Sequence, residues 1–149
     1  MSEDRWSSLS LPEGQVESLQ LAADGARIIG YHSEARAGVV DLAYDPPTDA
    51  WSELPTDRLH GFDRVIVPHD GDLYLFAVPD RAEGQAPDDT SYYHAAVLEP
   101  GADSWRMLPE SAVVGSLGRW TALGDLIVNP VPQSGWAPEP PGGVLDTPT

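Results

Sequence analysis

Short runs in which apolar and polar residues alternate follow one another along most of the chain, and turn-forming residues separate the runs. Alternation with a period of two is typical of β-strands that bury one face. The strands that it predicts span residues 16–22, 26–31, 39–44, 64–68, 73–78, 91–98, 117–122 and 126–128, with further short strands around Trp51 and Trp105. No segment keeps an apolar period of 3.6 residues, and proline recurs too often for long helices. The pattern therefore predicts an all-β protein.

Glycines mark the turns between paired strands. Gly25, Gly71 and Gly124 each stand between two predicted strands, where glycine supplies the positive φ of the primed turns that close hairpins. The first two are 46 residues apart and the last two are 53 apart. A unit of about 50 residues with four short strands thus recurs, which is typical of a repeat architecture.

A tryptophan segment recurs in the same register. Residues 45–55 and 99–109 share an acidic residue, a proline, two turn residues, an aspartate, a small residue and a tryptophan, with Leu-Pro three residues later. Asp4-Arg5-Trp6 repeats the aspartate and the tryptophan once more. A single four-stranded sheet cannot bury both of its faces, so we expect the sheets to stack on one another. Trp6, Trp51 and Trp105 then cover the gaps between sheets, and each indole buries on the order of 200 Å².

These segments resemble kelch repeats. That family is characterised by a glycine-containing inner hairpin and by a tyrosine and a tryptophan at the spacing that Tyr44 and Trp51 keep. Leu98 takes the place of the tyrosine in the second copy, and the paired glycines that follow the second strand in the family are missing. The resemblance covers nearly the whole chain and implies the four-stranded blades of a β-propeller.

The resemblance implies one partial propeller domain over residues 1–149, with about three four-stranded antiparallel blades in an incomplete ring. Residues 1–10 are the outer strand of a split blade, 16–55 the first blade, 64–109 the second, and 117–149 a third blade that lacks its outer strand. Two explanations are open. The chain is either part of a longer propeller chain, or two copies form a homodimer head-to-tail and each donates its Trp6 strand to the last blade of the other.

Composition narrows the classes of partner. Lys and Arg number 8 against 24 Asp and Glu, which gives a net charge of -16. Nucleic acid and anionic membrane surfaces both attract basic proteins, so neither is an expected partner. The acidic surface is interpreted as solubilising. The chain has no cysteine, and its start, residues 1–6, has no signal-peptide pattern. No apolar run approaches the ~18 residues of a membrane helix, and we expect a cytoplasmic protein.

Few residues indicate chemistry. The four histidines show no metal-ligand spacing, and His60 and His69 are expected in solvated loops. No nucleophile motif or phosphate-binding glycine loop is present. Asp45, Asp49 and Asp103 look like a carboxylate set, but aspartate in a turn caps its own backbone. The sequence predicts no catalytic residue, no metal site and no cofactor.

The leading functional hypothesis is a binding or scaffold module that recognises a protein or small ligand through loops on one propeller face. Some members of the resembled family are enzymes, and an alternative is part of a carbohydrate-directed enzyme with Arg and His residues lining a funnel. The candidate ligand-binding residues are Arg64, Arg119, Trp120, Tyr93 and His94. The two arginines could also simply offset acidic charge nearby. The copper chemistry of galactose oxidase, which resembles these propellers, is not supported because it needs a cysteine. A truncated, non-functional remnant is a third alternative.

Overall fold

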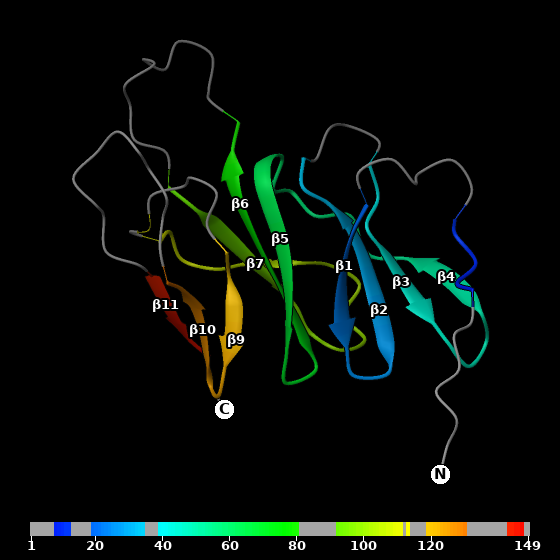
Figure 1. Cartoon of the computed structure of the whole chain (residues 1–149). Coiled ribbons are helices and arrows are strands. Elements are labelled where there is room, and N and C mark those ends of the chain that lie inside the picture. The colour runs from blue at the N-terminus through cyan, green and yellow to red at the C-terminus, as the bar shows by residue number, and fades with distance from the viewer. Residues whose placement is uncertain are drawn as a thin grey trace.

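The structure is a computed structural model, and it describes residues 8–12, 19–34, 39–80, 92–111, 113, 119–130 and 143–147. These residues form three antiparallel sheets, and each sheet consists of strands that follow one another in the chain (Figure 1). The predicted all-β character is confirmed. Within the described ranges, no helix has the length and apolar character that crossing a membrane requires.

Each sheet is a meander in which neighbouring strands pair in sequence order. The first sheet contains β1 (Leu19–Asp24), β2 (Arg27–His32), β3 (Leu42–Asp45) and β4 (Ala50–Glu53). The second contains β5 (Gly61–His69), β6 (Asp72–Pro79), β7 (His94–Leu98) and β8 (Arg106–Met107). The third contains β9 (Thr121–Leu123), β10 (Leu126–Asn129) and β11 (Gly143–Asp146). His32, predicted in a loop, ends β2, and Trp105 directly precedes β8. Of the outer strand predicted over residues 1–10, Trp6 and the rest of 1–7 lie outside the described residues, and residues 8–10 form no strand. The described residues form no closed ring.

The second sheet lies between the other two and buries both of its faces (Figure 1). Residues 73–78 of strand β6 are all apolar or aromatic. Successive side chains point to opposite faces of the sheet, and each face packs into a different core. Leu73, Leu75 and Ala77 join a core with the first sheet, whereas Tyr74, Phe76 and Val78 join a core with the third. We call the contact between the first and second sheets the first seam, and that between the second and third sheets the second seam.

Primed turns set the positions of the three hairpins. Gly25, Gly71 and Gly124 all have positive φ, as the turn type requires. Gly71 is the second residue of its turn and follows Asp70, which also has positive φ, whereas Gly25 and Gly124 come first in theirs. Counting from glycine to glycine therefore misplaces the repeat by one residue. The turns at 25–26, 70–71 and 124–125 are 45 and 54 residues apart, and this offset gives equivalent side chains the same face.

The two ends of the sheets differ in their connections. At one end, two-residue turns close the three hairpins, and residues 46–49 join β3 to β4 (Figure 1). At the opposite end, residues 33–41, 80–93 and 130–142 connect β2 to β3, β6 to β7 and β10 to β11. We call these the turn end and the loop end. Long connections on a rigid scaffold are the usual carriers of binding function.

Candidate functional site

The tryptophans of the repeat make the same contact in two successive sheets. Trp51 Nε1 donates a hydrogen bond to the Ser10 carbonyl oxygen at 2.6 Å, and Trp105 Nε1 donates to the Pro55 carbonyl oxygen at 2.7 Å. Ser10 and Pro55 each lie four residues after the tryptophan of the preceding repeat. Trp105 also packs against the core of the first seam. The recurring tryptophan therefore ties its sheet to the preceding segment of the chain.

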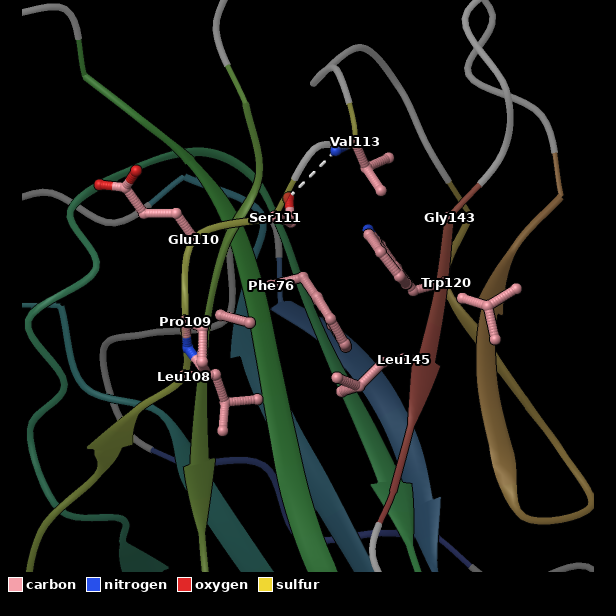
Figure 2. A pocket seen from close by; sticks show the side chains of 11 residues that line it. Phe76, Leu108, Pro109, Glu110, Ser111, Val113, Trp120, Gly143 and Leu145 are labelled. Atoms are coloured by element: carbon pink, nitrogen blue, oxygen red, sulfur yellow. Dashed lines mark hydrogen bonds between the residues drawn. The ribbon is translucent and has the colours of Figure 1, made fainter.

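A cavity of about 420 Å³ opens at the second seam (Figure 2). Its walls come from the second sheet, from the segment that follows β8, and from β11 of the third sheet. The residues that line it are Phe76, Ala95, Leu108, Pro109, Glu110, Ser111, Val113, Trp120, Gly143, Val144 and Leu145. Only Glu110 among them carries a charge, so the cavity favours an apolar or aromatic group over a charged one.

Three aromatic rings form the core beside this cavity. Trp120 stacks on Phe76 with ring centroids 4.0 Å apart and planes 7° from parallel. The ring of Tyr93 meets Trp120 edge-on at 5.4 Å. Tyr93 is fully buried and Trp120 is nearly so. Stacked and edge-on pairs are favourable aromatic arrangements, and these rings hold β9 and β10 against the second sheet.

The cavity wall formed by residues 108–111 and 113 runs alongside the beginning of β7 and is hydrogen-bonded to it. The backbone N–H of Leu108 donates to the Ala95 carbonyl, and the N–H of Tyr93 donates to the Val113 carbonyl, both at 2.9 Å. The Ser111 hydroxyl donates to the Tyr93 carbonyl and accepts the N–H of Val113. Figure 2 shows this turn at the rim. Ser111 is thus engaged by backbone groups, and no histidine lines the cavity to activate its hydroxyl.

The first seam has a buried ion cluster at its loop end. Arg64 lies within an irregularity of β5, where the register with β6 shifts between Phe62 and Val65, and such a shift redirects side chains. Its guanidinium contacts Asp41 at 2.8 Å and Asp57 at 2.7 Å and donates to the His32 carbonyl oxygen. Burial acts to lower the pKa of Arg64, but the hydrogen bonds and charges of Asp41 and Asp57 outweigh it and raise that pKa. The second arginine of the predicted ligand group, Arg119, is exposed.

Buried polar atoms without a hydrogen-bond partner gather at the loop end. Among the described side chains they are His32 Nδ1, Arg64 Nε, Trp120 Nε1 and both amide atoms of Asn129. His32 and Asn129 are the last residues of β2 and β10, and Trp120 directly precedes β9. His32 Nδ1 still lies 4.0 Å from Asp41 Oδ1. Buried polar groups are normally hydrogen-bonded, so the other atoms point to interactions that the described part of the chain does not provide.

The predicted ligand group does not form one cluster. Tyr93 and Trp120 meet at the second seam, with Arg119 and His94 next to them in the chain. Arg64 makes its contacts at the first seam. All five residues lie at the loop end, because β5, β7 and β9 begin there. The unpaired amide of Asn129 was missed by the sequence reasoning, since an asparagine at the end of a strand gives no signal of its burial.

At the turn end, three aspartates accept hydrogen bonds from nearby residues. Asp45 accepts hydrogen bonds from the backbone N–H and the hydroxyl of Thr48, and the Tyr44 hydroxyl donates to Asp49 at 2.7 Å. Asp103 accepts the Ser104 hydroxyl. The three carboxylates thus accept from side-chain hydroxyls nearby, whereas the sequence predicted that they would cap the backbone of their own turns. His69, predicted in a solvated loop, is instead buried at the end of β5 beside Thr147.

No metal centre emerges from the residues that the structure describes, because no three His, Asp or Glu side chains come together to bind an ion. Comparison of the sequence with models of known protein families, and with curated proteins, found no match. The resemblance to kelch repeats therefore depends on the repeated residues themselves.

Proposed function

We propose that this chain is a binding and scaffold module built from kelch-like propeller blades, and that it takes its ligand or protein partner at the loop end. The observation that carries the proposal is the gathering of unpaired buried polar atoms at that end: His32, Arg64, Trp120 and Asn129. A partner whose binding gives these groups hydrogen bonds supplies contacts that the described part of the chain does not provide. At the turn end, by contrast, the carboxylates of Asp45, Asp49 and Asp103 already accept hydrogen bonds.

The blade interpretation is supported by the tryptophan contacts. Two successive four-stranded meanders present a tryptophan of the outer edge to the carbonyl four residues after the preceding tryptophan. Sheets that repeat one contact in this way stack in series, which is how propeller blades share their cores. Loops from successive blades then meet on one face of the scaffold.

Catalysis is less well supported. Arg64, which the carbohydrate-directed alternative needs at a funnel, is already neutralised by Asp41 and Asp57. Among the described residues that line the cavity of the second seam, Glu110 is the one carboxylate, whereas acid–base hydrolysis of a glycoside uses a pair. The arrangement suits recognition through aromatic faces and hydrogen bonds.

The proposal is tested with two probes, a displayed library of random peptides and an array of oligosaccharides. Ligands selected on the purified chain are titrated against Asn129→Leu and Arg119→Ala at the loop end, with Asp125→Ala at the turn end as the matched control. We expect about tenfold weaker binding for at least one loop-end variant and an unchanged control, since a central contact contributes 1 kcal/mol or more.

Selected ligands that depend on Asp125 and ignore both loop-end variants would contradict the proposal. An oligosaccharide that the chain cleaves, with the activity lost in Arg64→Lys, would favour the enzyme. Folding of each variant is checked by circular dichroism, because Asn129 is fully buried.

A further inference from the structure

The tryptophan contact has a third acceptor. Trp51 donates to the carbonyl four residues after Trp6, and Trp105 donates to the carbonyl four residues after Trp51. The next carbonyl in this series belongs to Pro109, four residues after Trp105. Pro109 lines the cavity of about 420 Å³ at the second seam.

The opposite wall of that cavity is the place where a strand with a tryptophan would pair. In the first sheet Tyr44 pairs with Ile28, the second residue after the hairpin turn, and Trp51 stands opposite Tyr44. In the third sheet Leu145 pairs with Ile127, which is also the second residue after its turn. Leu145 is therefore the counterpart of Tyr44. Figure 2 shows Leu145 and Pro109 facing the cavity from two sides.

In the part of the chain that the structure describes, the edge of the third sheet is open at this point. Strand β11 pairs with β10 alone among the described residues, whereas β4 and β8 complete the corresponding edges of the first two sheets. An open edge presents unpaired backbone N–H and C=O groups that a further strand can bond. One strand that pairs with β11 and carries one tryptophan would complete the edge and fill the cavity at the same time.

We propose that the strand around Trp6 of a second copy of this chain occupies the edge of β11. Trp6 lies opposite Leu145, fills the cavity and donates its indole N–H to the Pro109 carbonyl. The segment Asp4-Arg5-Trp6 has the aspartate and tryptophan spacing of the strands that carry Trp51 and Trp105. The contact that closes the first seam is thus repeated between two molecules.

A Trp6 strand at this edge belongs to another copy, because the described position of Ser10 keeps Trp6 of the same chain away from the cavity. Trp51 lies on the face of the first sheet that points away from the second sheet, beside Gly30 and Leu19, and it holds Ser10 on that face. The cavity lies beyond two sheets, and packed sheets are about 10 Å apart. Four residues span at most about 14 Å when extended, which is less than the two spacings.

The exposed faces at the two ends of the stack support this assembly. Leu21 is 55% exposed on the outer face of the first sheet. Leu123 and Val144 are 66% and 63% exposed on the outer face of the third. When two copies join head-to-tail, the outer face of the first sheet of one copy covers the outer face of the third sheet of the other. The two contacts close a two-fold ring in which both faces are buried. The charge of -16 on each copy opposes association, so salt should strengthen it.

Mass in solution is the first test. Light scattering after size exclusion should give twice the 16.0 kDa of one chain at micromolar concentration and 0.5 M salt, with dissociation on dilution or at low salt. Trp6→Ala should weaken the dimer by at least about tenfold, while the exposed aromatic control Phe62→Ala leaves it unchanged. A folded monomer under all conditions, or a dimer that Trp6→Ala does not weaken, overturns the proposal.

A disulfide test fixes the register. The chain has no cysteine, so introduced thiols are the only ones present. If Trp6 lies opposite Leu145, then Ser7 lies opposite Val144, within the Cα separation that a disulfide bridges. A mixture of Ser7→Cys and Val144→Cys proteins should oxidise to a covalent heterodimer. Thr121→Cys, on the same outer face at the other edge of the third sheet, is the control. Equal cross-linking to positions 144 and 121 contradicts the proposed strand.

Discussion

The two seams of this protein join sheets of the same meander topology, yet they are closed differently. At the first seam Trp105 packs against the core and bonds to Pro55, and the loop end is filled by the Arg64 ion cluster. At the second seam the stacked rings of Phe76 and Trp120 fill the core, and a cavity remains where the first seam has its tryptophan. The difference teaches that the fourth strand of a sheet matters chiefly through the one side chain that closes the seam.

The largest effect is expected at the ion cluster. Arg64→Ala leaves the carboxylates of Asp41 and Asp57 close together without their cation, and we expect a loss of about 3–5 kcal/mol in the free energy of unfolding. Urea unfolding at one fixed protein concentration measures it. Arg106→Ala is the control, because its ion pair with Glu99 is exposed and contributes at most about 1 kcal/mol. Equal losses in both variants would show that burial does not strengthen the cluster.

Truncation of Trp105 should make the first seam resemble the second. We expect Trp105→Ala to cost about 3 kcal/mol, since it leaves a hollow against the core. Trp105→Phe keeps one six-membered ring and removes the pyrrole part of the indole with its hydrogen bond to Pro55, so the loss should be smaller, about 1–2 kcal/mol. Thermal and urea unfolding compare the two variants. If both lose the same stability, the ring packing contributes little and the comparison between seams fails.

Two glycines should respond differently to a methyl group. A Cβ at Gly61 meets the backbone carbonyl of Val78, which cannot move without breaking the sheet, so Gly61→Ala should cost about 2–3 kcal/mol. A Cβ at Gly143 meets the side chain of Val113, which lies beside the cavity and can turn into it. Gly143→Ala should therefore cost less than about 1 kcal/mol. Urea unfolding compares the two losses. If Gly143→Ala costs more stability than Gly61→Ala, then the Val113 side chain cannot move into the cavity.

The smallest effect is a loss of stability at alkaline pH. Burial, and the charge of Asp41, raise the pKa of Tyr31 at the first seam, and burial does the same for Tyr74 at the second. A raised pKa means that the folded state keeps the phenol proton longer than the unfolded chain does. The stabilisation of the folded state by the neutral phenol is complete below pH 10.0, the ordinary pKa of tyrosine. It is lost as the pH rises from there toward the raised pKa of the folded state. Tyr31→Phe should flatten urea-derived stability between pH 9 and 11, whereas an unaltered slope would exclude Tyr31 as the source.

Much of the strand order followed from local features of the sequence. Turn glycines and alternation located the paired strands, and Trp51 and Trp105 marked the outer edges of two sheets. The error of one residue in the hairpin register arose because Gly71 takes the second turn position after Asp70. Both arrangements give a primed turn, so the residue type alone does not distinguish them.

The sequence by itself determined that this chain forms antiparallel meanders, because turns and alternation act within a few residues. Only the tertiary structure decided that Arg64 is bound by Asp41 and Asp57, that each described repeat tryptophan meets the preceding segment, and that the second seam holds a cavity. The partners in the tryptophan contacts are 41 and 50 residues apart. Such contacts depend on how whole sheets stack, and no local pattern of residues specifies that.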